Sequence, residues 1–165
     1  MRALYDSADE EMRRRWDRSL PLADAVLDRW ERAERLGFAE GASIYNSALV
    51  YGDVSVGERS WIGPNVLLDG SGGRLVIGAW CSISAGVQIY THDTVAWSTS
   101  LGQSEHAKAP TTIGSGAYIG PNSVIAKGVT IGDRAVIGAM SFVNADIPAG
   151  KKAWGTPAKV VGDSV

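Results

Sequence analysis

Aliphatic residues recur at every sixth position through most of the chain. These anchors keep a constant phase within three blocks, which two interruptions separate. They are Ile44, Val50, Val56, Ile62 and Leu68, then Ile77, Ile83 and Ile89, then Ile113, Ile119, Ile125, Ile131, Ile137 and Val143. Neither a helix, with a period of about 3.6 residues, nor a strand, which alternates, sustains this rhythm. The period instead predicts a coil in which short strands and corners alternate, three times per turn.

The fourth residue after each anchor is small or aliphatic, which indicates a second inward position in every repeat. These residues are Ala48, Val54, Ser60, Val66, Cys81, Val87, Ala117, Ser123, Val129, Ala135, Ser141 and Ile147. We therefore predict a mainly β chain, with a parallel β-helix of hexapeptide repeats over residues 41–150. A helical segment over residues 1–40 precedes the coils, and a C-terminal strap over residues 151–165 follows them.

Two helices are expected ahead of the coils. Ser7 and Glu10 have the spacing of a capping box and predict the start of the first helix. Pro21 interrupts the helical pattern, and a second helix is predicted over about residues 21–36, with Gly37 placed to end it. This segment is expected to cap the open first coil or to pack on a neighbouring subunit.

Composition and charge indicate an ordinary soluble globular protein, with 45% apolar residues and a net charge of −2. The first residues lack the apolar core of a signal peptide, and no apolar stretch is long enough to span a membrane. The basic residues are too few and too dispersed for a nucleic-acid surface. We expect a cytoplasmic protein with no membrane or nucleic-acid partner. Its single cysteine, Cys81, falls on an inward position and is expected to be structural.

Both interruptions leave the same side of the predicted prism. That second side carries the anchors Val50, Leu68, Ile89, Ile125 and Val143. After Leu68 the chain inserts three extra residues in Asp69-Gly-Ser-Gly-Gly, and after Ile89 it leaves room for an extruded loop, predicted over residues 94–112. The two bulges are one coil apart and predict a cleft, the kind of place where function resides on a rigid scaffold.

His92 stands at the root of the long loop and is one of two histidines in the chain. A histidine titrates near neutrality and can accept a proton from a hydroxyl or an amine, so we predict that His92 is a general base. The alternative is a surface histidine on a loop. Asp93 either leaves the coil with the loop or buries a carboxylate near His92. His106, inside the loop, could be a lid contact, a substrate ligand or an exposed polar residue.

The repeats, Thr91-His92 at the loop root, Pro110-Thr-Thr-Ile-Gly114 at the loop end and Gly155-Thr-Pro-Ala-Lys159 in the tail resemble hexapeptide-repeat acyltransferases. The nearest branch is that of the galactoside and maltose O-acetyltransferases, and the chain is also similar to transferases of bacterial polysaccharide clusters. The resemblance covers residues 44–162 and leaves out the helical segment. It implies a left-handed coil, a homotrimer, acetyl-CoA as the acyl donor and no metal.

The same resemblance implies roles for individual residues. It makes His92 the general base and Asn65 a substrate contact, although the Gly-Pro-Asn turn of Asn65 recurs at Asn122 and a corner role is an equal alternative. Asp69, Ser71 and Tyr90 offer hydrogen-bonding groups beside His92. Asp69, Tyr90 and Asp93 are predicted to bind substrate. Acetyl-CoA is expected in a groove between subunits, against Tyr118, Gly120, Ala139, Asn144 and Lys159. The chain departs from the family pattern at Tyr118, where a tryptophan is found, and at Pro121, where a serine is found.

The function that these residues predict is transfer of an acetyl group to a hydroxyl or amine of a sugar or nucleotide sugar. His92 would deprotonate the acceptor, which attacks the thioester directly, without a covalent acyl-enzyme. One alternative is a non-catalytic β-helix that serves as a scaffold for interactions, against which the histidine at the loop root argues. The other is a γ-class carbonic anhydrase, which is disfavoured because its zinc needs three histidines and this chain has two.

Overall fold

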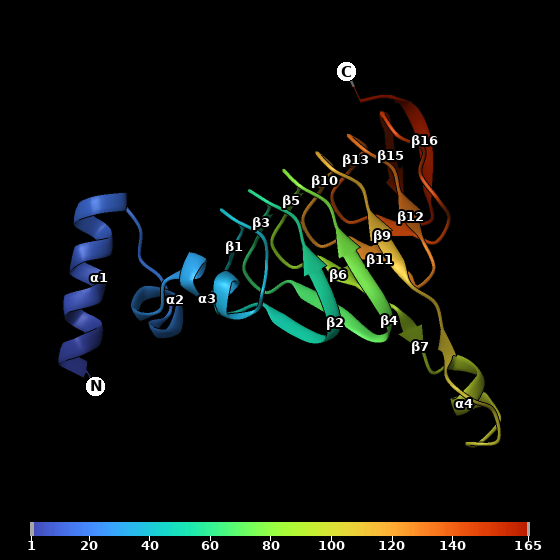
Figure 1. Cartoon of the computed structure of the whole chain (residues 1–165), viewed down its shortest axis with the longest axis horizontal. Helices are drawn as coiled ribbons and strands as arrows, with labels where there is room; N and C mark the ends of the chain where they lie inside the picture. The colour runs from blue at the N-terminus through green and yellow to red at the C-terminus, as the bar shows by residue number, and fades with distance from the viewer. Residues whose placement is uncertain (1, 165) are drawn as a thin grey trace.

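The computed structural model describes residues 2–164 and shows a β-helix with helices at its N-terminal end. In Figure 1 the short strands stack from the blue-green start of the coil to its orange and red end, and one loop carrying α4 projects from the side. The strands of successive coils pair in parallel. The predicted architecture of stacked hexapeptide coils is therefore confirmed.

The first side of the prism is a parallel stack that ends in a hairpin. It contains β1 (Ser43–Ile44), β3 (Trp61–Ile62), β5 (Ser82–Ile83), β10 (Tyr118–Ile119) and β13 (Val136–Ile137). β15 (Lys151–Gly155) continues this stack, and β16 (Ala158–Asp163) turns back antiparallel to it. The expected C-terminal strap is thus a hairpin whose first strand closes the last coil.

The second and third sides form one continuous sheet, because β2 (Leu49–Val56) and β4 (Leu67–Ile77) each run through the corner between them. The second side continues with β6 (Gln88–Ile89), β11 (Val124–Ile125) and β14 (Phe142–Val143), and the third with β9 (Thr111–Ile113) and β12 (Thr130–Ile131). The anchors assigned to the second side pair in register from Val50 to Val143. Counting in sixes therefore placed them on the correct side.

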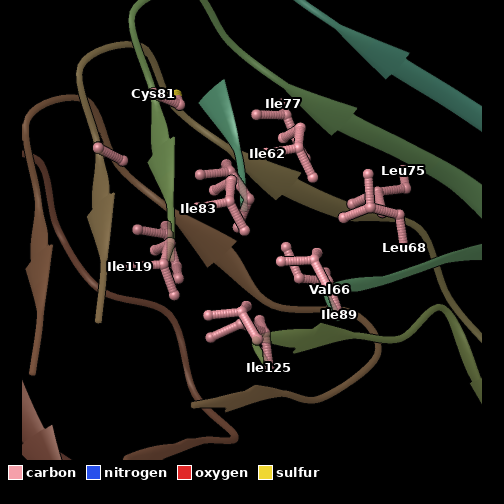
Figure 2. Close-up of a cluster of buried hydrophobic side chains, with 14 of the residues drawn as sticks. Ile62, Val66, Leu68, Leu75, Ile77, Cys81, Ile83, Ile89, Ile119 and Ile125 are labelled. Atoms are coloured by element: carbon pink, nitrogen blue, oxygen red, sulfur yellow. The ribbon is translucent and has the colours of Figure 1, made fainter. Parts of the chain in front are cut away.

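The core is a column of anchor side chains along the axis of the coil. Figure 2 shows Ile62, Ile83 and Ile119 stacked above one another, with Leu68, Ile89 and Ile125 facing them. All six are fully buried, and each contributes about 1.5–3 kcal/mol relative to an exposed side chain. Among the anchors, Val50 in the first coil is only partly buried.

The second inward positions are filled as predicted, and Cys81 is one of them. Its side chain is 2% exposed, and burial raises the pKa of the thiol. A buried, protonated thiol is a poor nucleophile, so the structural role expected for Cys81 agrees with its surroundings.

The helical segment differs from its prediction in two places. α1 (Arg2–Trp16) begins well before Ser7, so the capping-box prediction is wrong and Ser7 lies inside the helix. The single helix predicted over residues 21–36 is also wrong, because the chain forms α2 (Leu22–Val26) and α3 (Arg29–Arg35). Between them Asp28 adopts an extended conformation and accepts hydrogen bonds from the backbone amides of Trp30 and Glu31. N-cap chemistry therefore starts a new helix where the apolar pattern alone suggested continuity.

α3 covers the first coil. Arg32 donates hydrogen bonds to the backbone carbonyls of Tyr45 and Ala48, and Ala33 is buried against the coil. Gly37, with φ of +73°, ends the helix as predicted. α1, by contrast, has no buried residue. Across residues 2–164, no helix combines the length and the apolar character needed to cross a bilayer.

Candidate active site

The two interruptions meet in space at the root of the long loop. The buried hydroxyl of Thr91 donates to the backbone carbonyl of Asp69 at 2.8 Å and accepts from the backbone amide of Gly72 at 3.0 Å. Gly72 approaches so closely that a Cβ built on it would lie 2.4 Å from the Cβ of His92. The insertion and the loop root are therefore bound together, as the stacking of the two bulges predicted.

The buried carboxylate of Asp69 contacts the imidazole of His92. Its Nδ1 lies 3.0 Å from Oδ2 of Asp69, whose side chain is 5% exposed, while the imidazole is 28% exposed. The other carboxylate oxygen accepts from the backbone amide of Ser71 at 2.9 Å and from its hydroxyl at 2.5 Å. A carboxylate at Nδ1 favours the tautomer with its proton on that nitrogen, which leaves Nε2 free to accept a proton.

This geometry supports a positioning role for Asp69, whereas the sequence suggested substrate binding. We expected Asp69 to bind substrate, but its oxygens face His92 and Ser71, and it is almost inaccessible to solvent. Orienting the imidazole is the role that its position supports. Ser71, expected beside His92, holds Asp69 in place, and Thr91 holds the loop root; the sequence assigned neither of these positioning roles.

The loop begins and ends as a short antiparallel ribbon. β7 (His92–Asp93) pairs with β8 (Ala107–Lys108), which brings Lys108 opposite His92, and α4 (Val95–Thr99) lies between them. His106 folds back toward the root, with its ring centroid 6.4 Å from that of His92 and 5.6 Å from Trp97. Of the three interpretations left open for His106, a lid contact fits this position. β9 begins at Thr111, so Thr111 and Thr112 lie in the coil and not in the loop.

Asp93 leaves the coil with the loop, the first of the two alternatives considered for it. One carboxylate oxygen forms an ion pair with the ammonium group of Lys127, and the other accepts from the backbone amide of Val95 at 3.0 Å. Lys127 is the largest cause of a lowered pKa at Asp93. Tyr90 donates its hydroxyl to Gln88 at 2.7 Å, and burial, followed by the charge of Asp69, raises the pKa of the phenol.

Asn65 lies at an exposed corner, away from these contacts. It has φ of +55°, and Asn122 has nearly the same value at 57°. Asparagine tolerates this left-handed conformation better than most residues. Its backbone amide donates to the hydroxyl of Ser47 at 3.4 Å, and its role as a substrate contact stays a prediction beside the corner role.

The residues expected to contact acetyl-CoA lie at separate places on one protomer. Tyr118 is 41% exposed on β10 of the first side. Gly120 and Ala139 touch at the corner after that side, where a Cβ on Gly120 would lie 2.5 Å from the amide nitrogen of Ala139. Asn144 is exposed just after β14, and Lys159 is exposed on β16. A ligand touching all five would need a surface longer than one corner.

No cluster of three or more histidine, cysteine or acidic side chains that could bind a metal occurs in the described part of the chain. The groups that this site offers are one imidazole, 28% exposed, a buried carboxylate that orients it and a loop that partly covers it.

Comparison with known proteins agrees with the repeat and the fold. Residues 110–145 match the family model described as bacterial transferase hexapeptide (six repeats). The carnitine operon protein CaiE of Escherichia coli K12 is 37% identical over 128 residues, which cover 73% of this chain and 64% of CaiE. The chain thus spans a little under two thirds of the length of that relative.

Solved structures extend the similarity to nearly the whole chain. The hexapeptide-repeat acetyltransferase VCA0836 of Vibrio cholerae has a TM-score of 0.73 and 26% identity, and the match covers 99% of this chain and 92% of VCA0836. A galactoside acetyltransferase in complex with coenzyme A has a TM-score of 0.69 and 26% identity, over 99% of this chain and 80% of that protein. VCA0836 is also known in complex with acetyl-CoA, and that structure has a TM-score of 0.64. By its repeats and by its fold, the chain is similar to the hexapeptide-repeat acetyltransferases and has their architecture.

Proposed function

We propose that this protein transfers an acetyl group from acetyl-CoA to a hydroxyl or amine of a sugar or nucleotide sugar. The observation that carries the proposal is the imidazole of His92, held by the buried Asp69 at the root of the loop. The similarity to VCA0836 and to the galactoside acetyltransferase, which bind acetyl-CoA and coenzyme A, supports the choice of donor. A cytoplasmic location, expected from the sequence, and a role in polysaccharide modification, expected from the resemblance, stay predictions.

In the proposed reaction, Nε2 of His92 takes the proton of the acceptor as its oxygen or nitrogen attacks the thioester carbonyl. The new bond to the carbonyl carbon forms, the carbon–sulfur bond breaks, and the imidazolium returns its proton to the departing thiolate. Asp69 keeps its charge throughout and stabilises the imidazolium. A positioned base of this kind contributes roughly 10²- to 10⁴-fold to the rate.

We also propose that the enzyme is a homotrimer. A stripe of outward side chains on the second side supports this, since Leu49, Leu67, Val124 and Phe142 lie in register around Gln88. Leu49 is 51% exposed and Phe142 is 38% exposed. An exposed, mostly apolar stripe of this kind is typical of a protein interface. A groove between subunits would also explain why Tyr118, Gly120, Ala139, Asn144 and Lys159 do not meet on one protomer.

Calorimetric titration with coenzyme A and acetyl-CoA tests the donor, and release of free thiol with a panel of sugars and nucleotide sugars tests the transfer. We expect both the native protein and His92→Ala to bind coenzyme A, because the imidazole acts on the acceptor. Thiol release should fall on the order of 10²-fold or more in His92→Ala. Absence of coenzyme A binding by both proteins would rule out the proposed donor and favour a scaffold.

A further inference from the structure

One corner of the coil that follows the loop holds both ends of the loop. This corner, Lys127–Gly128, follows β11 after one intervening residue, Ala126. Lys127 forms its ion pair with Asp93 where the loop leaves, and the backbone amide of Gly128 donates to the hydroxyl of Thr111 at 3.1 Å where the loop returns. The hydroxyl of Thr111 donates in turn to the backbone carbonyl of Tyr90 at 2.7 Å. His92 therefore lies between two points that the same corner fixes.

Two carboxylates lie near His92, and they differ in the groups that bind them. Asp69 is buried, bonded to Nδ1 and to Ser71. Asp93 follows His92 in the chain, is 38% exposed and depends on Lys127 for its counter-charge. His92 and Asp93 are consecutive residues of β7, so a charge on Asp93 acts on the imidazole over a short distance.

The remaining polar groups that face His92 come from the loop and from the second side. Lys108 stands opposite it in the β7–β8 pair, and the ring of His106 lies 6.4 Å away. Ser71 has its hydroxyl oxygen 3.4 Å from Nδ1. Among the residues that the structure describes, none of these groups forms an ion pair with Asp93. Lys127 is thus the cation that balances the second carboxylate.

We propose that Lys127 is a positioning residue that neutralises Asp93 and so keeps His92 in the unprotonated form that a general base requires. A carboxylate without a counter-ion beside an imidazole favours the imidazolium, which cannot accept a proton. This inference rests on the proposed role of His92. Because Lys127 lowers the pKa of Asp93, the pair is complete at neutral pH and is lost as the pH falls through that lowered value.

The test is the direction in which charge removal moves the acid limb of the rate–pH profile. Lys127→Met leaves the Asp93 carboxylate without a counter-ion, and we expect the acid limb of the profile to move to higher pH by about half a unit. Asp93→Asn leaves the Lys127 cation without its carboxylate, and the acid limb should move to lower pH. The double variant should return close to the native profile, as should Lys127→Arg. A merely structural role would lower the rate in these variants without opposite displacements.

A second measurement needs no acceptor. Because the chain has two histidines, imidazole resonances of protein labelled with ¹⁵N-histidine can be followed through a pH titration, with His106→Gln identifying the signal of His92. The His92 midpoint should move in the same directions as the rate profile. Lys151→Met, which breaks the exposed pair with Asp163, is the matched control and should leave it unchanged.

The outcomes separate this inference from the proposed function. Opposite displacements of the His92 midpoint without any detectable acetyl transfer would uphold the part played by Lys127 and count against the transferase. Midpoints that coincide in the native protein, Lys127→Met and Asp93→Asn would overturn the inference, whatever reaction the enzyme performs.

Discussion

At the scale of single residues, the competence of His92 depends on which of its nitrogens carries the proton. Asp69 sets this by accepting from Nδ1. In Asp69→Asn an amide can donate to Nδ1 and favour the opposite tautomer, in which Nε2 is protonated and cannot act as a base. We expect kcat to fall on the order of 10²-fold, within the contribution of a general base, and the KM for acetyl-CoA to stay unchanged. Steady-state kinetics measures both.

Ser71→Ala is the matched control for that substitution. It removes the hydroxyl that donates to Asp69 but keeps both the carboxylate and the backbone amide that binds it. We expect a much smaller loss of kcat than in Asp69→Asn. Equal losses in the two variants would show that Asp69 matters for the local fold and not for the tautomer.

At the scale of elements, the insertion in β4 packs closely against the loop root because Gly72 has no side chain. A Cβ on Gly72 would lie 2.4 Å from the Cβ of His92 and 2.5 Å from the carbonyl oxygen of Thr91. Gly72→Ala should therefore destabilise the fold by about 1–3 kcal/mol and also lower kcat, because His92 must shift. Urea unfolding and initial rates measure the two effects.

Gly162→Ala serves as the control, since nothing lies within 4 Å of a Cβ built at that position. Its stability and its rate should match those of the native protein. A Gly72→Ala variant with native stability and native kcat would mean that the insertion and the loop root are not in contact in solution.

The elements of the coil could be predicted from sequence because a fixed period is a strong signal. Ile44 pairs with Ile62 and Ile119 pairs with Ile137, as counting in sixes requires. The helices could not be predicted as well. The pattern around Ser7 resembles a capping box although a helix already runs through it, and the cap at Asp28 was hidden inside an apolar stripe.

The site was predicted in part, for a related reason. His92 and the common side of both interruptions follow from the sequence. The pairing of Asp69 with His92 and that of Lys127 with Asp93 depend on which side chains point toward each other across coils, and the period does not state this. The contact between His106 and His92 depends on how an irregular loop folds, so it had no sequence signal. The left-handed sense of the coil stays a prediction from the resemblance.

At the scale of the whole molecule, the apolar stripe on the second side predicts that the chain associates. Phe142→Lys places a charge at the C-terminal end of the apolar stripe, and we expect the mass in solution to fall from three times the 17.4 kDa of one chain toward that of one chain. Sedimentation equilibrium measures it. Thr130→Lys, on an exposed outward position of the third side, should leave the assembly intact. A native protein that sediments as a single chain would rule out the trimer.

The long loop has the length of a whole turn. Ile44 pairs with Ile62 in the next coil, whereas Ile77 pairs with Ile113, twice as far along the chain. The chain thus leaves the second side, spends the residues of one complete coil outside the prism and returns without any change in the frame of the anchors. Coil stability and the surface presented to an acceptor are consequently separate properties. Evolution, or a protein engineer, can exchange the loop for another of different length and leave every stacked isoleucine where it was.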